Sequence, residues 1–114
     1  MLIGPGQPLY VLLFSALIIS DDSTPNLKQR IAKKTQDAGL LVAGANGMGF
    51  YNVRDRVLAG GFDTRDHPYP GNVTLISQSG AGMSGIVDCE RRIQFNFAVS
   101  SGYELTVSME DYLD

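Results

Sequence analysis

A short polar stretch in the second half of the chain is the clearest candidate for chemistry. It consists of Ser77, Gln78, Ser79 and Gly80. An apolar run at residues 73–76 precedes it and predicts a buried strand, and apolar residues at helical spacing follow it. The start of a helix offers unpaired backbone amides and a partial positive charge, so this strand–turn–helix unit predicts a phosphate or other anion site. The alternative is an ordinary helix cap, since the Walker lysine is missing.

A second glycine-rich loop lies earlier in the chain. Residues 40–43 form an apolar run that leads into Gly44, Asn46, Gly47 and Gly49. α/β folds bind ligands at the carboxyl ends of parallel strands, so the loop is a candidate for ligand contacts. A tight turn that needs glycine for backbone reasons explains it equally well. Residues 50–52 have an extended pattern rather than a helical one, so the glycines are not a dinucleotide fingerprint.

The elements around these two loops predict an α/β fold. Residues 10–15 form a continuous apolar strand, and a helix begins at Thr24 and Pro25 and ends at Gly39. With the strand at 40–43, this gives one parallel strand–helix–strand unit. Residues 53–72 have no periodicity and are expected to be a connection.

The second half repeats the strand–helix alternation. The helix after Gly80 is expected to end at Arg91 and Arg92. A strand is predicted at residues 93–99, with Phe95 and Phe97 on one face. A last helix is expected from residue 107 or 108 onwards.

Composition excludes several function classes. The chain has 114 residues and a net charge of −3, and its basic residues are scattered, which argues against a nucleic-acid partner. The apolar residues 9–19 are too few to span a membrane and lack a basic flank, so no membrane partner and a cytoplasmic location are expected. The single cysteine, Cys89, fits a reducing compartment and is expected to be a small buried residue on a helix.

His67, the single histidine, lies between Asp66 and Pro68 in the expected connection. It is a candidate general base or phosphoryl carrier, but a loop histidine beside proline is more often simply exposed, and we expect that here. The sequence has no Cys/His cluster at metal-ligand spacing and no nucleophilic triad, so neither a metal site nor a catalytic residue is expected.

Three separated segments together resemble the nucleoside-diphosphate-forming (ADP-forming) acyl-CoA synthetases, the acetate–CoA ligase type, which are related to the succinyl-CoA synthetase α subunit. Residues 38–52 are similar to the strand and Gly-Pro-Asn-x-x-Gly loop that ends that family's CoA-binding domain. Residues 71–80 are similar to its strand and Ser-x-Ser-Gly turn, and residues 97–104 with 111–113 to its Val-Ser-x-Gly-x-Glu segment and Asp-Tyr-Leu helix.

The resemblance implies the end of a Rossmann-like CoA-binding domain at residues 1–52, a linker at 53–71 and the start of a flavodoxin-like parallel-sheet domain at 72–114. It implies a ligase that joins a carboxylic acid to CoA while ATP becomes ADP and phosphate, through an acyl phosphate and a phosphohistidine. Ser77, Gln78, Ser79 and Gly80 would contact the phosphoryl group, and Gly44, Asn46 and Gly47 would line the CoA or acyl end.

The sequence departs from the family pattern in two ways. Ala45 stands where the family has proline. The family's carrier histidine lies beyond the Val-Ser-x-Gly segment, so His67 does not match it, and the ATP-grasp part that uses ATP and Mg is absent. The chain alone is therefore expected to be an inactive fragment that works with an ATP-grasp domain or subunit. A non-catalytic CoA- or phosphate-binding module, or the sensor part of a protein acyltransferase, is the alternative.

Overall fold

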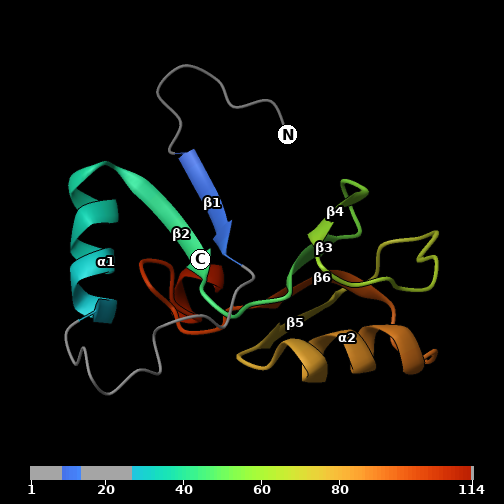
Figure 1. Cartoon of the computed structure of the whole chain (residues 1–114). Helices are drawn as coiled ribbons and strands as arrows, with labels where there is room; N and C mark the ends of the chain where they lie inside the picture. The colour runs from blue at the N-terminus through green and yellow to red at the C-terminus, as the bar shows by residue number, and fades with distance from the viewer. Residues whose placement is uncertain (1–8, 14–26, 114) are drawn as a thin grey trace.

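The computed structural model describes residues 9–13 and 27–113 and has an α/β architecture, as the sequence predicts (Figure 1). Its elements are β1 (Leu9–Leu13), α1 (Leu27–Asp37), β2 (Leu40–Gly44), β3 (Gly49–Asn52), β4 (Val57–Gly60), β5 (Val73–Ser77), α2 (Gly80–Cys89), β6 (Phe95–Ser100) and the short 3-10 helix η1 (Glu110–Tyr112). The strands form one two-stranded and one four-stranded sheet. None of the helices in the described part of the chain is long and apolar enough to cross a membrane.

The first sheet confirms the expected strand–helix–strand unit. β1 and β2 pair in parallel, with α1 between them in the sequence. Gly39 has φ +67° directly after α1, the left-handed conformation expected of a residue that ends a helix. Val42 of β2 is buried with Ala45 and Leu105 in a small core. The expected helix start at Thr24 and Pro25, and the end of the first strand at residues 14 and 15, lie outside the described residues.

The second sheet is mixed, in the order β4-β3-β6-β5. β5 and β6 pair in parallel, whereas β3 pairs antiparallel with both β4 and β6. The expected linker thus contains a strand, β4, which forms a hairpin with β3. The division between the sheets falls between β2 and β3 rather than after Asn52. The hairpin turn is closed by Asn52, whose side-chain oxygen accepts a hydrogen bond from the Asp55 amide at 3.0 Å.

α2 covers one face of the second sheet (Figure 1), where Met83 and Val87 pack against Phe95 and Ala98. Phe95 and Phe97 do not share a face, contrary to the expectation from simple alternation. The register between β5 and β6 shifts by one residue beside Phe95, because Phe97 rather than Asn96 pairs with Thr74. Such a bulge turns the following side chains to the other face. Phe97 therefore stacks on Phe50 with ring centroids 5.8 Å apart, away from α2.

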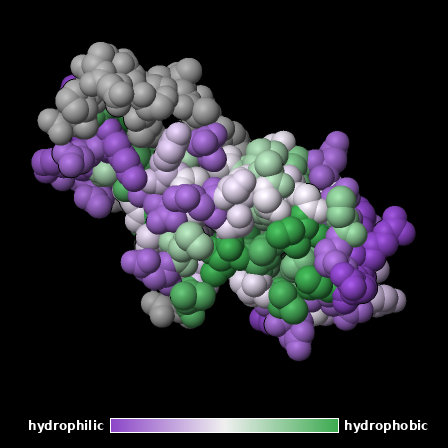
Figure 2. Space-filling model, turned by 90° about the horizontal axis from the view of Figure 1, so that it is seen from below, coloured by the Kyte–Doolittle hydropathy of each residue, from purple (hydrophilic) through white to green (hydrophobic). Residues whose placement is uncertain are grey.

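Two further expectations are corrected. Cys89 is exposed, not buried, because the inward positions of α2 are Met83 and Val87, and a residue two positions beyond Val87 points to the other side of a helix. The expected last helix is only the 3-10 turn η1, and the Asp111 carboxylate accepts a hydrogen bond from the Ser108 amide at 2.7 Å there. From below, apolar side chains concentrate over the middle of the surface, and hydrophilic ones lie toward both ends (Figure 2).

Candidate functional site

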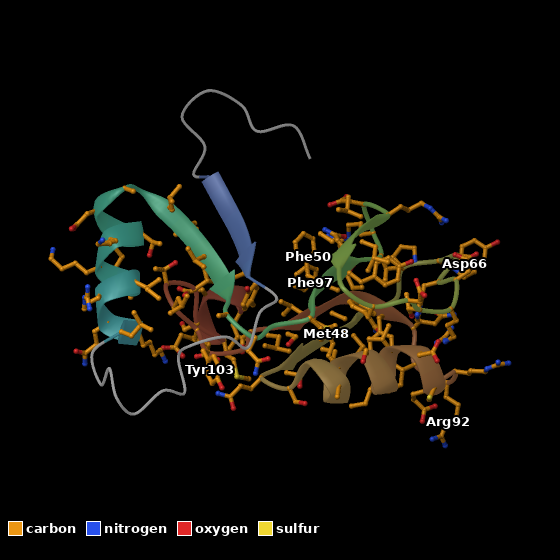
Figure 3. The ribbon with its side chains drawn as sticks, viewed as in Figure 1. Met48, Phe50, Asp66, Arg92, Phe97 and Tyr103 are labelled. Atoms are coloured by element: carbon orange, nitrogen blue, oxygen red, sulfur yellow. The ribbon has the colours of Figure 1, made fainter. Side chains whose placement is uncertain are left out.

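A cavity of about 470 Å³ lies at the N-terminal end of α2. Three chain segments line it: the loop between β2 and β3, the start of α2, and the turn after β6. The lining residues are Asn46, Gly47, Met48, Gln78, Ser79, Gly80, Ala81, Gly102 and Tyr103. Met48 and Tyr103 come toward this end of α2 from the first and third of these segments (Figure 3). The structure thus brings the two loops predicted from sequence into one site.

The segment after β6 holds the other two in place through backbone hydrogen bonds. On one side, the Ser101 and Gly102 amides donate to the carbonyls of Ser77 and Gln78 at 2.9 and 3.3 Å. On the other, the Tyr103 amide donates to the Ala45 carbonyl at 2.8 Å. Backbone–backbone bonds of this kind fix the separation of the loops independently of side-chain rotamers. The cavity is therefore built into the fold rather than formed by mobile side chains.

Glycines allow the three segments to approach this closely. A Cβ at Gly47 would lie 2.7 Å from the Ser100 carbonyl oxygen, closer than real Cβ atoms come. A Cβ at Gly102 would collide with the Ala45 carbonyl oxygen, and Gly102 also has φ +63°, which side chains rarely tolerate. The glycine spacing in the sequence thus reflects contact between backbones.

The start of α2 offers free donors to the cavity. Ser79 is the N-cap residue, and its hydroxyl oxygen accepts a hydrogen bond from the Gly82 amide at 3.1 Å. Among the described residues, the amides of Gly80 and Ala81 have no acceptor, although both residues line the cavity. Unpaired first-turn amides and the helix dipole together favour an anion. The ordinary cap therefore leaves room for an anion at the same helix start, because the Ser79 hydroxyl satisfies only the Gly82 amide of the first turn.

The predicted site residues separate into lining and supporting positions. Gln78, Ser79, Gly80, Asn46 and Gly47 line the cavity. Ser77 supports the turn instead, because its hydroxyl donates to the Ser79 carbonyl at 2.9 Å and accepts from the Ser79 amide at 3.2 Å. Gly44 is buried, and its carbonyl accepts a hydrogen bond from the Leu105 amide at 2.8 Å.

Sequence reasoning did not assign four lining residues to the site: Met48, Ala81, Gly102 and Tyr103. Gly102 and Tyr103 lie in the third segment that carried the family resemblance, so that segment was the available signal. Met48 had no such signal, because only the fold places it against α2.

Comparison with known proteins identifies solved structures with a similar fold. No family model matches the sequence, and no curated protein matches it. Among solved structures, acetyl-coenzyme A synthetase 1 of Candidatus Korarchaeum cryptofilum, described as dinucleotide forming, aligns over 93% of this chain and 23% of its own, with 25% identity and a TM-score of 0.75. The chain is similar to part of this synthetase. PH0766 from Pyrococcus horikoshii OT3 aligns over 92% of this chain and 24% of its own, with 23% identity and a TM-score of 0.78.

The similarity to the synthetase confirms the resemblance predicted from the three segments. The chain spans about a quarter of the length of each of these two proteins. The synthetase structure was solved in complex with phosphate and ADP.

His67 lies away from this site and is buried, contrary to the expectation of an exposed loop histidine. Only 4% of it is exposed, and its ring contacts those of Tyr51 and Phe95 edge-on, at centroid distances of 5.4 and 6.0 Å. Burial, together with the nearby Arg65 charge, lowers the pKa of His67 below its usual value. Within residues 9–13 and 27–113, no three His, Cys, Asp or Glu residues come together in a way that would hold a metal ion.

Proposed function

We propose that this chain is part of an acid–CoA ligase and that its cavity binds the phosphoryl group that such an enzyme transfers. One observation carries the proposal: three loops converge on a cavity into which the start of α2 presents the amides of Gly80 and Ala81. The similarity to a synthetase solved with phosphate and ADP supports the same ligand class.

The chemistry assigned to the site is binding and charge stabilisation. The amides of Gly80 and Ala81 would donate to phosphoryl oxygens, and the α2 dipole would stabilise their negative charge. Asn46 and Gly47 line the same cavity from the loop between β2 and β3, where the acyl group or the thiol end of CoA would approach. In the complete enzyme, CoA supplies the thiol that becomes the thioester, and ATP with Mg supplies the phosphoryl group.

The position of His67 bears on the carrier step. It is the single histidine of the chain, and it is not among the residues that line the cavity. A phosphohistidine working at this site would therefore have to come from another polypeptide segment. We propose that the enzyme is completed by an ATP-grasp domain or subunit and by a carrier histidine other than His67. We also propose that the chain by itself has no CoA-dependent ATP hydrolysis. Robust hydrolysis by the purified chain would contradict this.

Binding at α2 is tested by NMR titration of the isotope-labelled chain with inorganic phosphate at constant ionic strength. Saturable shifts are expected for the amide signals of Gly80 and Ala81, with much smaller shifts for Gly85, farther along the same helix. Sodium chloride at the same ionic strength is the control for general screening. If the Gly80 and Ala81 signals respond no more to phosphate than to chloride, the site is wrong.

A further inference from the structure

A second cavity lies at the other end of α2. Its volume is about 200 Å³, and it lies between the segment that precedes β5 and the segment that joins α2 to β6. Arg65, His67 and Tyr69 line it from the first segment, and Arg91 and Gln94 from the second. Asp66 and Arg92, which neighbour these residues in the sequence, both lie at this end of the molecule in Figure 3.

His67 gives this cavity a buried polar wall that the proposed function does not use. Its ring is held edge-on between the rings of Tyr51 and Phe95. Among the described residues, its Nε2 atom has no hydrogen-bond partner, although it is fully buried. Buried polar atoms in folded proteins almost always have a partner, so an unpaired one beside a cavity points to a group that the cavity receives.

The charges around the cavity leave one cation available. Each nearby carboxylate already has a partner: Asp66 with Arg56 at 3.7 Å, Glu90 with Arg92 at 2.6 Å, and Asp88 with the Arg65 amide at 3.1 Å. The Arg65 guanidinium donates to the carbonyls of Asp88 and Glu90, both at 3.1 Å. Arg91 makes no ion pair or hydrogen bond with any described residue. The cavity therefore has an unpaired guanidinium and an unpaired imidazole nitrogen.

We propose that this cavity binds a small oxyanion, a carboxylate or a phosphate, between Arg91 and His67, and that Nε2 takes up a proton from solvent when the anion binds. The anion supplies the negative charge that an imidazolium needs in a buried position. Among the described residues, the other titratable groups that face His67 are Arg65 and Asp66 on its own segment, Asp88 on α2 and the Tyr51 phenol on β3, and from β6 the ring of Phe95 packs against it. The Arg65 contacts with Asp88 and Glu90 connect the cavity directly to the end of α2.

The test follows the ring protons of His67, which give a single histidine signal set because the chain has one histidine. The signal is titrated with pH in sodium chloride, sodium acetate and sodium phosphate at equal ionic strength. Binding that favours the protonated ring about tenfold raises the titration midpoint by about one pH unit. If the titration midpoint rises with acetate alone, the cavity is a carboxylate site. If the midpoint rises with phosphate, it is a phosphate site. The same midpoint in all three salts would overturn the proposal.

Two variants separate this site from the one at the start of α2. Arg91→Gln should abolish most of the midpoint shift, whereas Arg92→Gln is the matched control and should keep it, because Arg92 is paired with Glu90. Both side chains are exposed, so the fold should tolerate either change. Ser79→Ala should also leave the shift intact. A shift that survives in Arg91→Gln and disappears in Ser79→Ala would assign the effect to the other end of α2 and contradict the proposal.

Discussion

Gly80, the first residue of α2, lies directly against the side chain of Met48. A Cβ at position 80 would collide with Met48 Cγ, near the base of that side chain rather than at its flexible end. Met48 belongs to the loop between β2 and β3, so this contact brings that loop against the start of α2 at the cavity wall. Residue 80 must therefore be glycine for the loop and the helix to approach this closely.

Gly80→Ala is expected to lower the free energy of unfolding by about 1–3 kcal/mol, because the new methyl group would clash with the Met48 side chain. Gly85→Ala is the matched control in the same helix. A Cβ there meets no atom within 4 Å, so alanine should raise stability by about 0.5–1 kcal/mol through helix propensity. Chemical denaturation measures both. Equal effects of the two substitutions would contradict the close contact at Met48.

Ser79→Ala removes the N-cap of α2. The Gly82 amide loses its acceptor, and stability should fall by about 0.5–2 kcal/mol. Ser84→Ala provides the comparison, because the Ser84 hydroxyl makes only a 3.4 Å contact with the Ala81 carbonyl, and its loss should change stability by less than about 0.5 kcal/mol. Unfolding curves of the two variants that coincide would show that the cap contributes nothing.

Thr106 joins the segment after β6 to β2. Its hydroxyl oxygen accepts a hydrogen bond from the Val42 amide at 2.6 Å, and only 1% of Val42 is exposed. Thr106→Val keeps the shape but leaves that amide unpaired, which should cost about 1–3 kcal/mol of stability. Thr106→Ser retains the hydroxyl and should lose clearly less. If chemical denaturation shows that the Thr106→Ser variant is less stable than the Thr106→Val variant, the role of the hydroxyl is refuted.

His67 should make stability depend on pH. Its pKa is lowered in the folded state by burial and by Arg65, so the unfolded chain binds the proton more readily. The stability that this neutral histidine contributes is full above the unfolded pKa of about 6.5 and is lost as pH falls below it, with a slope of at most about 1.4 kcal/mol per pH unit. His67→Phe cannot titrate, so it should remove this dependence between about pH 5.5 and 7.5. Denaturation midpoints across that range check the sign, and stability that rises as pH falls would contradict it.

The sequence alone predicted the features that depend on neighbours in the chain. Strand–helix–strand alternation, the glycine after α1 and the turn before α2 follow from local periodicity and turn chemistry, which act within a few residues. The three segments at matching spacing also indicated the synthetase resemblance. Five of the seven predicted site residues line the cavity, because the carboxyl ends of strands in an α/β fold lie where ligands bind.

Tertiary structure decided what depends on segments far apart in the sequence. β4 is too short for its alternation to stand out, and the pairing of β3 with β6 places residues 49–52 in the second sheet. The register shift beside Phe95 placed Phe97 on the other face, and the packing of residues 61–72 on the sheet buried His67. Met48 entered the cavity, and Ser77 became a support of its turn, through contacts that no local pattern encodes. Local rules give the elements, whereas burial and hydrogen-bond partners are settled only when distant elements pack together.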